Sequence, residues 1–192
     1  LHLGQAMDIY WHRNPHLFPS VQEYTQMVHL KTGTLASLAV QTGFLAGGAT
    51  KEEALKMGKV AAALGEGFQI LDDVQNLTTG NPGKKRGDDI VEGKKSLPVL
   101  LHVQQNPDDK DKIAELFAKA SKEGIDSPAV EQCIEILEKS NAIQEAQKKG
   151  AEIIEKNVEI LADVFKNAAS SKSAKMIKEL FKEMILKFRA EK

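Results

Sequence analysis

Cysteine, aromatic residues and net charge are all scarce in this 192-residue sequence. Cys133 is the only cysteine, which excludes a disulfide framework and a cysteine-rich zinc site. The 26 basic residues nearly balance the 27 acidic ones, and the formal net charge of −1 argues against a nucleic-acid partner held by a broad basic surface. No apolar run reaches the roughly 18 residues of a membrane span, and no signal peptide is recognisable, so we expect no transmembrane segment and a cytoplasmic location.

The apolar residues recur at helical spacing, and no alternating strand pattern of useful length occurs. Two capping boxes, Ser20 with Glu23 and Thr50 with Glu53, predict helices over about 20–48 and 51–78. Further helices are predicted over residues 98–105, 108–122, 141–167 and 173–188, with another that begins at Ser127-Pro128. We therefore expect a single all-α domain over residues 1–192.

A pair of aspartates, Asp72 and Asp73, lies late in the second long predicted helix. Asn76 follows Asp72 by one turn, and Gln69 precedes both aspartates by about one turn. Two adjacent carboxylates among large apolar residues are costly unless a cation compensates them. Oxygen ligands without a nearby His or Cys suit Mg²⁺, which binds through one or two carboxylates and through phosphate oxygens. The alternative is an exposed helix end at which both aspartates are simply solvated.

A loop rich in glycine and lysine follows this helix directly. It holds half of the basic residues of the first 107 positions, namely Lys84, Lys85, Arg86, Lys94 and Lys95. Glycines let a loop approach a ligand closely, and lysines bind phosphate as point charges. The carboxylates and this loop together predict a metal–diphosphate site, although a solvated surface loop would have a similar composition. The P-loop spacing is absent.

Five short motifs in a fixed order carry a family resemblance. They are Gly4-Gln5-Ala6-Met7-Asp8-Ile9-Tyr10-Trp11, Tyr24-x2-Met27 ahead of Lys31-Thr32-Gly33, Phe68-Gln69-Ile70-x-Asp72-Asp73-x-x-Asn76-Leu77, Lys85-x-Gly87-x-Asp89, and Glu92-Gly93-Lys94-x-Ser96-x-Pro98. Over about residues 1–105 the chain resembles the C-terminal part of the trans-isoprenyl diphosphate synthases, the polyprenyl synthetase family. It is most similar to short-chain members, in particular geranylgeranyl diphosphate synthases.

The resemblance implies a fold, a reaction and an assembly. The fold would be the C-terminal part of an all-α, isoprenoid synthase-type helical bundle. The reaction would be a Mg²⁺-dependent prenyl transfer, in which an allylic diphosphate ionises and isopentenyl diphosphate attacks it, giving a short-chain geranylgeranyl or farnesyl diphosphate. The resemblance also implies a homodimer.

The resemblance further assigns roles to individual residues. It implies that Asp72 and Asp73 hold Mg²⁺, and that Asn76, at a position that is acidic in many relatives, contributes its carbonyl oxygen or a metal-bound water. It also implies that Lys31 and Lys94 bind the allylic diphosphate together with Lys84 or Lys85, of which we favour Lys85. Thr32 and Gln69 would flank the reacting carbons. Gln5 and Asp8 would support the site.

Three of these residues have plainer interpretations. Lys31 could lay its aliphatic part along the helix and keep its ammonium in water. Thr32 and Gly33 could mark only a helix kink, and Gln69 could be a structural hydrogen-bonding residue.

The first aspartate-rich motif of the family, followed by paired arginines, is absent from the sequence. We therefore expect this chain to be the C-terminal portion of a longer enzyme, and to be inactive alone. The competing hypotheses are a non-catalytic subunit of a heteromeric prenyl synthase, a class I terpene cyclase-like enzyme, and a plain helical scaffold.

Overall fold

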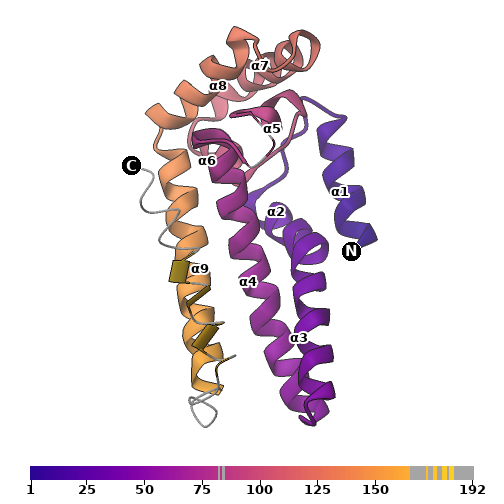
Figure 1. Cartoon of the computed structure of the whole chain (residues 1–192). Coiled ribbons are helices and arrows are strands. Elements are labelled where there is room, and N and C mark those ends of the chain that lie inside the picture. Colours follow the sequence, from indigo (N-terminus) through magenta and orange to yellow (C-terminus); the bar gives the residue numbers. More distant parts are fainter. Residues whose placement is uncertain are drawn as a thin grey trace.

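The computed structural model describes residues 1–81, 83 and 85–164, together with Lys172, Lys175, Met176, Glu179, Leu180, Lys182 and Glu183. All regular structure among these residues is helical (Figure 1), so the all-α prediction is confirmed. The elements are α1 (His2–His12), α2 (Val21–Val28), the π-helical turn η1 (His29–Gly33), α3 (Thr34–Ala46), α4 (Lys51–Thr78), α5 (Asp88–Val91), α6 (Leu97–Gln105), the 3-10 turn η2 (Pro107–Asp109), α7 (Lys110–Glu123), α8 (Pro128–Lys139) and α9 (Ala142–Val164). The helix predicted over 173–188 lies largely outside the described residues.

Helix α4 is the central element. Its capping box forms as the sequence predicts, because Thr50 Oγ1 accepts from the Glu53 amide at 3.2 Å and Glu53 accepts from the Thr50 amide at 2.8 Å. Figure 1 shows α4 running between α9 and α3, with α7 and α8 crossing one end of the bundle. Gly67 permits the close approach of α9, because a Cβ at this position would lie 2.7 Å from Ile154 Cγ1. The helix therefore presents one face to α9 and another to the α2–α3 segment.

The helix predicted over 20–48 forms with an irregularity in its middle. Residues His29–Gly33 make a π-helical turn, and α2 and α3 continue on either side of it. Gly33 lies against α4, where a Cβ would meet Ala62 O at 3.1 Å. The turn contains Lys31 and Thr32, and π-helical turns inside α-helices are frequent at functional sites.

The larger hydrophobic core cluster lies where α6, α7 and α8 meet the end of α4, and a smaller cluster lies between α4 and α9. Phe117, Ile113 and Leu137 are completely buried in the larger cluster. Cys133 belongs to this core, and burial raises the pKa of its thiol to about 12, so it is a packing residue. None of the described helices is both long and apolar enough to cross a membrane.

Helix α3 contrasts with this core because it has no buried residue. Leu35, Leu38 and Leu45 are each at least half exposed in the described structure. One face of α3 contacts α4, and the apolar side chains of the other face have no covering element among the described residues.

Candidate metal–diphosphate site

The predicted site residues gather at the end of α4 that carries the aspartate pair. A small cavity of about 10 Å³, enough for one water molecule, lies between α1, α2, η1, α4 and the loop that precedes α6. It is lined by Asp8, Tyr24, Met27, Lys31, Gln69, Asp73, Lys94 and Lys95. The structure thus brings together four predicted residues, Lys31, Gln69, Asp73 and Lys94, from three separate segments.

Asp73 is the centre of this cluster and is fully buried. Tyr24 Oη donates to Asp73 Oδ2 at 2.7 Å, and Gln69 Nε2 donates to Asp73 Oδ1 at 3.1 Å. Lys94 Nζ lies 2.7 Å from the same Oδ1. A buried carboxylate needs such a cation and donors to offset its lost hydration. Asp73 therefore organises the protein side of the site.

Tyr24 is a residue whose role the sequence reasoning missed, although it belongs to one of the motifs. Its ring is buried, and burial together with the Asp73 carboxylate raises the pKa of Tyr24 well above its usual value. The phenol thus stays protonated and donates to Asp73. The sequence showed only that a tyrosine lies seven residues before Lys31. Asp73, the partner of Tyr24, is 49 positions away in the sequence, so their contact could not be predicted.

Lys94 joins the loop to α4. Its ammonium bridges Asp73 and Asp89, with Nζ 2.8 Å from Asp89 Oδ2. Burial alone would lower the pKa of Lys94, but the two carboxylates outweigh burial and raise that pKa. Lys94 is therefore a permanent cation at the wall of the cavity.

The three predicted metal ligands differ in their surroundings. Asp72 is partly exposed, and its Oδ1 accepts from Asn81 Nδ2 at 2.9 Å. Asn76 is fully buried, and its Oδ1 accepts from the Asp89 amide at 3.1 Å, which ties the loop to α4. Asp73 is buried among its donors, so Asp72 is the member of the set that faces outward.

The donor chemistry around Asp72 fits Mg²⁺. Asn81 Oδ1 lies beside it as a buried oxygen without a hydrogen-bond partner among the described residues. Within the same residues no three His, Cys, Asp or Glu side chains gather closely enough to hold a metal ion by themselves. Mg²⁺ commonly binds one or two carboxylates and takes its remaining ligands from water and substrate phosphate, so a sparse oxygen set is compatible with it.

Lys31 is paired with the first motif. Its Nζ lies 2.5 Å from Asp8 Oδ2, and His12 Nε2 lies 3.0 Å from Asp8 Oδ1. Burial would raise the pKa of Asp8, but His12 and Lys31 outweigh it and lower the pKa to about 2. The pairing depends on Gly4, where a Cβ would lie 2.6 Å from the Lys31 amide nitrogen.

Thr32 and Gln69 form one hydrogen-bonded chain with the aspartates. Thr32 Oγ1 donates to Gln69 Oε1 at 3.0 Å, and the Gln69 amide then donates to Asp73. The orientation of the Gln69 side chain is thus fixed from both ends. Gln5, in contrast, is exposed on α1.

Lys85, predicted to bind substrate, does not reach the cavity. Its Nζ lies 3.0 Å from Asp126 in the connection between α7 and α8, and this pair is exposed. Lys84 lies outside the described residues, so the choice between the two lysines stays a prediction. The neighbouring Arg86 anchors the loop instead, because it contacts Leu77 O, Glu131 and Glu138.

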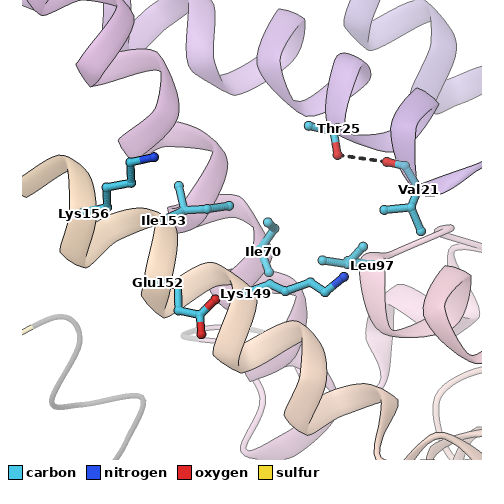
Figure 2. Close-up of a pocket in the computed structure, with 8 residues that line it drawn as sticks. All are labelled: Val21, Thr25, Ile70, Leu97, Lys149, Glu152, Ile153 and Lys156. Carbon is cyan, nitrogen blue, oxygen red and sulfur yellow. Dashed lines mark hydrogen bonds between the residues drawn. The ribbon is translucent and has the colours of Figure 1, made fainter.

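A larger pocket of about 350 Å³ lies on the side of α4 that faces α9 (Figure 2). Val21, Ile70, Leu97 and Ile153 supply its apolar wall, and Figure 2 shows Lys149 extending across it from α9 toward Leu97. It contains none of the predicted site residues.

Comparisons with known proteins agree with the motif order. The chain matches the polyprenyl synthetase family over residues 1–137. It is 42% identical over 109 residues to a geranylgeranyl pyrophosphate synthase of Gibberella zeae, covering 56% of this chain and 28% of the relative. It is 34% identical over 146 residues to a geranylgeranyl pyrophosphate synthase of Penicillium paxilli, covering 75% of this chain and 37% of the relative.

Solved structures share the fold. A geranylgeranyl pyrophosphate synthetase from Pyrococcus horikoshii superposes with a TM-score of 0.73 at 28% identity, covering 95% of this chain and 53% of that one. The chain spans about a third of the length of the two curated relatives and about half of this structure. On the family match and the shared helical fold, the chain belongs to the polyprenyl synthetase family.

Proposed function

We propose that this chain supplies the second aspartate-rich half of the active site of a Mg²⁺-dependent prenyltransferase. The enzyme would condense isopentenyl diphosphate with an allylic diphosphate to form geranylgeranyl or farnesyl diphosphate. The observation that carries the proposal is the cluster of Asp73, Lys31 and Lys94 around one cavity, with Asp72 next to Asp73 on α4. The similarity to geranylgeranyl pyrophosphate synthases supports the same reaction class.

Mg²⁺ would be held by Asp72, with Asp73 and Asn76 acting behind it. The ion, when bound, would stabilise the negative charge that develops on the departing diphosphate. Asp73 would help by holding Lys94, and Asn76 would help by holding the Asp89 backbone. This division follows from exposure, because only Asp72 of the three is partly exposed.

The substrate-facing work would fall to Lys31, Lys94, Thr32 and Gln69. The two ammonium groups would neutralise diphosphate oxygens and orient the leaving group. Thr32 and Gln69 present oxygen atoms whose direction the hydrogen-bonded chain fixes. Such pre-oriented dipoles would favour a passing carbocation without needing to reorganise.

The proposal extends to assembly. We propose that the enzyme is a homodimer. The contact surface would include the exposed apolar side chains of α1, which are Leu3, Ile9 and Tyr10. We also propose that the 192-residue chain alone does not elongate prenyl chains, because it holds one of the two aspartate-rich motifs that the reaction needs.

An elongation assay tests the proposed function. The 192-residue chain is incubated with an allylic diphosphate, labelled isopentenyl diphosphate and Mg²⁺, beside the product of the complete reading frame. The complete product should release a short-chain prenyl diphosphate, and the 192-residue chain should release none. Cyclic hydrocarbons from the complete product would contradict the assigned reaction, and elongation by the 192-residue chain would contradict its inactivity.

A further inference from the structure

Lys95 is an unusual lysine because it is buried with no carboxylate partner in the part of the chain that the structure describes. Its relative exposure is 2%, and it forms no ion pair among the described residues. Lysine is almost never fully buried unless it is paired. Burial lowers the pKa of Lys95 to about 8, which reflects the cost of holding a cation there.

Two aromatic rings and one backbone carbonyl stabilise the buried ammonium of Lys95. Its Nζ lies 5.1 Å from the centroid of the Phe18 ring and 4.7 Å from that of Phe117. Aromatic faces attract a cation but replace only part of its hydration. Among the described residues, the ammonium donates one hydrogen bond, to Gly93 O at 3.0 Å. Two rings and one carbonyl thus hold the group.

The carbonyl that Lys95 holds belongs to the turn that presents Lys94. Gly93 has a φ of +77°, and a Cβ there would lie 3.2 Å from His12 O. The next amide, that of Lys94, donates to Asp89 O at 2.9 Å. The Lys94 side chain extends to Asp73 and Asp89, and the Lys95 side chain extends to the Phe18 and Phe117 rings.

We propose that Lys95 is a positioning residue, which holds the Gly93 carbonyl from the core side and so fixes the turn from which Lys94 reaches Asp73 and Asp89. This inference rests on the proposed function, because the purpose of fixing Lys94 is diphosphate binding. Lys95 also lines the cavity that Lys31 and Lys94 line, so its charge adds to the positive potential there.

A residue with this role should behave differently from an ordinary core residue. K95M keeps the length of the side chain and replaces the cation by a thioether that packs well against aromatic rings. Replacing a buried charge by an apolar group of similar volume is often neutral or stabilising. The variant should therefore melt at the same temperature as wild type or higher, while losing affinity for diphosphate. Gains in stability at the expense of function are typical of residues kept for function.

The experiment compares wild type, K95M and K110M as 192-residue chains. Lys110 is the matched control, because its Nζ also faces the Phe18 ring, at 5.9 Å, but Lys110 is exposed at the start of α7. Affinity for inorganic diphosphate with Mg²⁺ is measured by calorimetry, the melting temperature by circular dichroism, and exchange of the Lys94 amide by NMR. K95M should weaken binding about tenfold and speed Lys94 exchange by a similar factor, and K110M should change neither.

Unchanged exchange of the Lys94 amide in K95M would overturn the proposal. So would a fall in melting temperature that accompanies the loss of affinity, because that result describes a merely structural residue. If wild type itself binds no diphosphate, the proposed function fails. The exchange and melting data then decide the positioning role alone.

Discussion

Two regions that flank α4 differ in how far their side chains find partners among the described residues. At the aspartate end, the buried carboxylates of Asp73 and Asp89 share Lys94, whose side chain is partly buried, as their cation. On the α3 side, Leu35 and Leu38 are more than half exposed among the described residues. The charged groups of the aspartate end are thus paired with one another, while the apolar side chains on the outer face of α3 are exposed. The difference shows that the ion pairs of the aspartate end form between described residues of this chain, whereas these residues leave the outer face of α3 uncovered.

The largest effect should come from breaking the buried ion cluster. D73N removes the negative charge that faces Lys94 and leaves one acceptor oxygen for Tyr24, Gln69 and Lys94 together, so the lysine keeps only Asp89 as a charged partner. Breaking a buried pair from one side costs about 3 kcal/mol. Urea denaturation should show this loss. D108N, the same change at an exposed residue, should leave the free energy of unfolding unchanged. Equal stability of the two variants would contradict the idea that the cluster is a structural unit.

The two sides of the bundle should respond oppositely to one substitution. G67A places a Cβ 2.7 Å from Ile154 Cγ1 on the α9 side, so it should destabilise the chain by about 2 kcal/mol. G43A places a Cβ in open space on α3 and should stabilise by about 0.5 kcal/mol, because alanine favours a helix. Thermal melts of both variants measure the contrast. A destabilising G43A would mean that another element covers this face.

Acid should weaken the pairing of Asp8 with Lys31 at a defined pH. The pKa of Asp8 is about 2 in the folded chain against an ordinary 3.8. A carboxyl group whose pKa is lowered by folding stabilises the folded chain at every pH above its ordinary pKa. This stabilisation is lost as the pH falls from about 4 to 2. The contribution is about 2 kcal/mol. Unfolding measured from pH 6 to 2 should therefore show a smaller pH dependence in D8N than in D108N. An equal pH dependence of the unfolding free energy in D8N and D108N would contradict a stabilising pairing of Asp8 with Lys31.

The sequence predicted what depends on local chemistry. The capping boxes of Ser20 and Thr50 placed the starts of α2 and α4, because both partners lie within one turn. The order of the short motifs predicted the family and the grouping of Lys31, Gln69, Asp73 and Lys94. Each cap and each motif is encoded within a short stretch of chain, and the family resemblance supplied how the motifs come together.

The rest depends on contacts between distant segments. Nothing near Asp72 and Asp73 indicates that one is partly exposed and the other buried, because the difference comes from Tyr24 and Lys94. Lys85 fits the spacing of a substrate lysine, yet its partner is Asp126, 41 positions along the chain. The burial of Lys95 likewise depends on Phe18 and Phe117, which only the folded core brings together.

Calorimetric titration of the 192-residue chain with inorganic diphosphate, with and without Mg²⁺, tests the central claim most directly. The account predicts binding that requires Mg²⁺ and that weakens at least about tenfold in D72N, since this carboxylate would hold the ion. D108N should bind like wild type. Binding that does not require Mg²⁺, or that D72N leaves intact, would contradict the assignment of the aspartate end of α4 as a metal–diphosphate site.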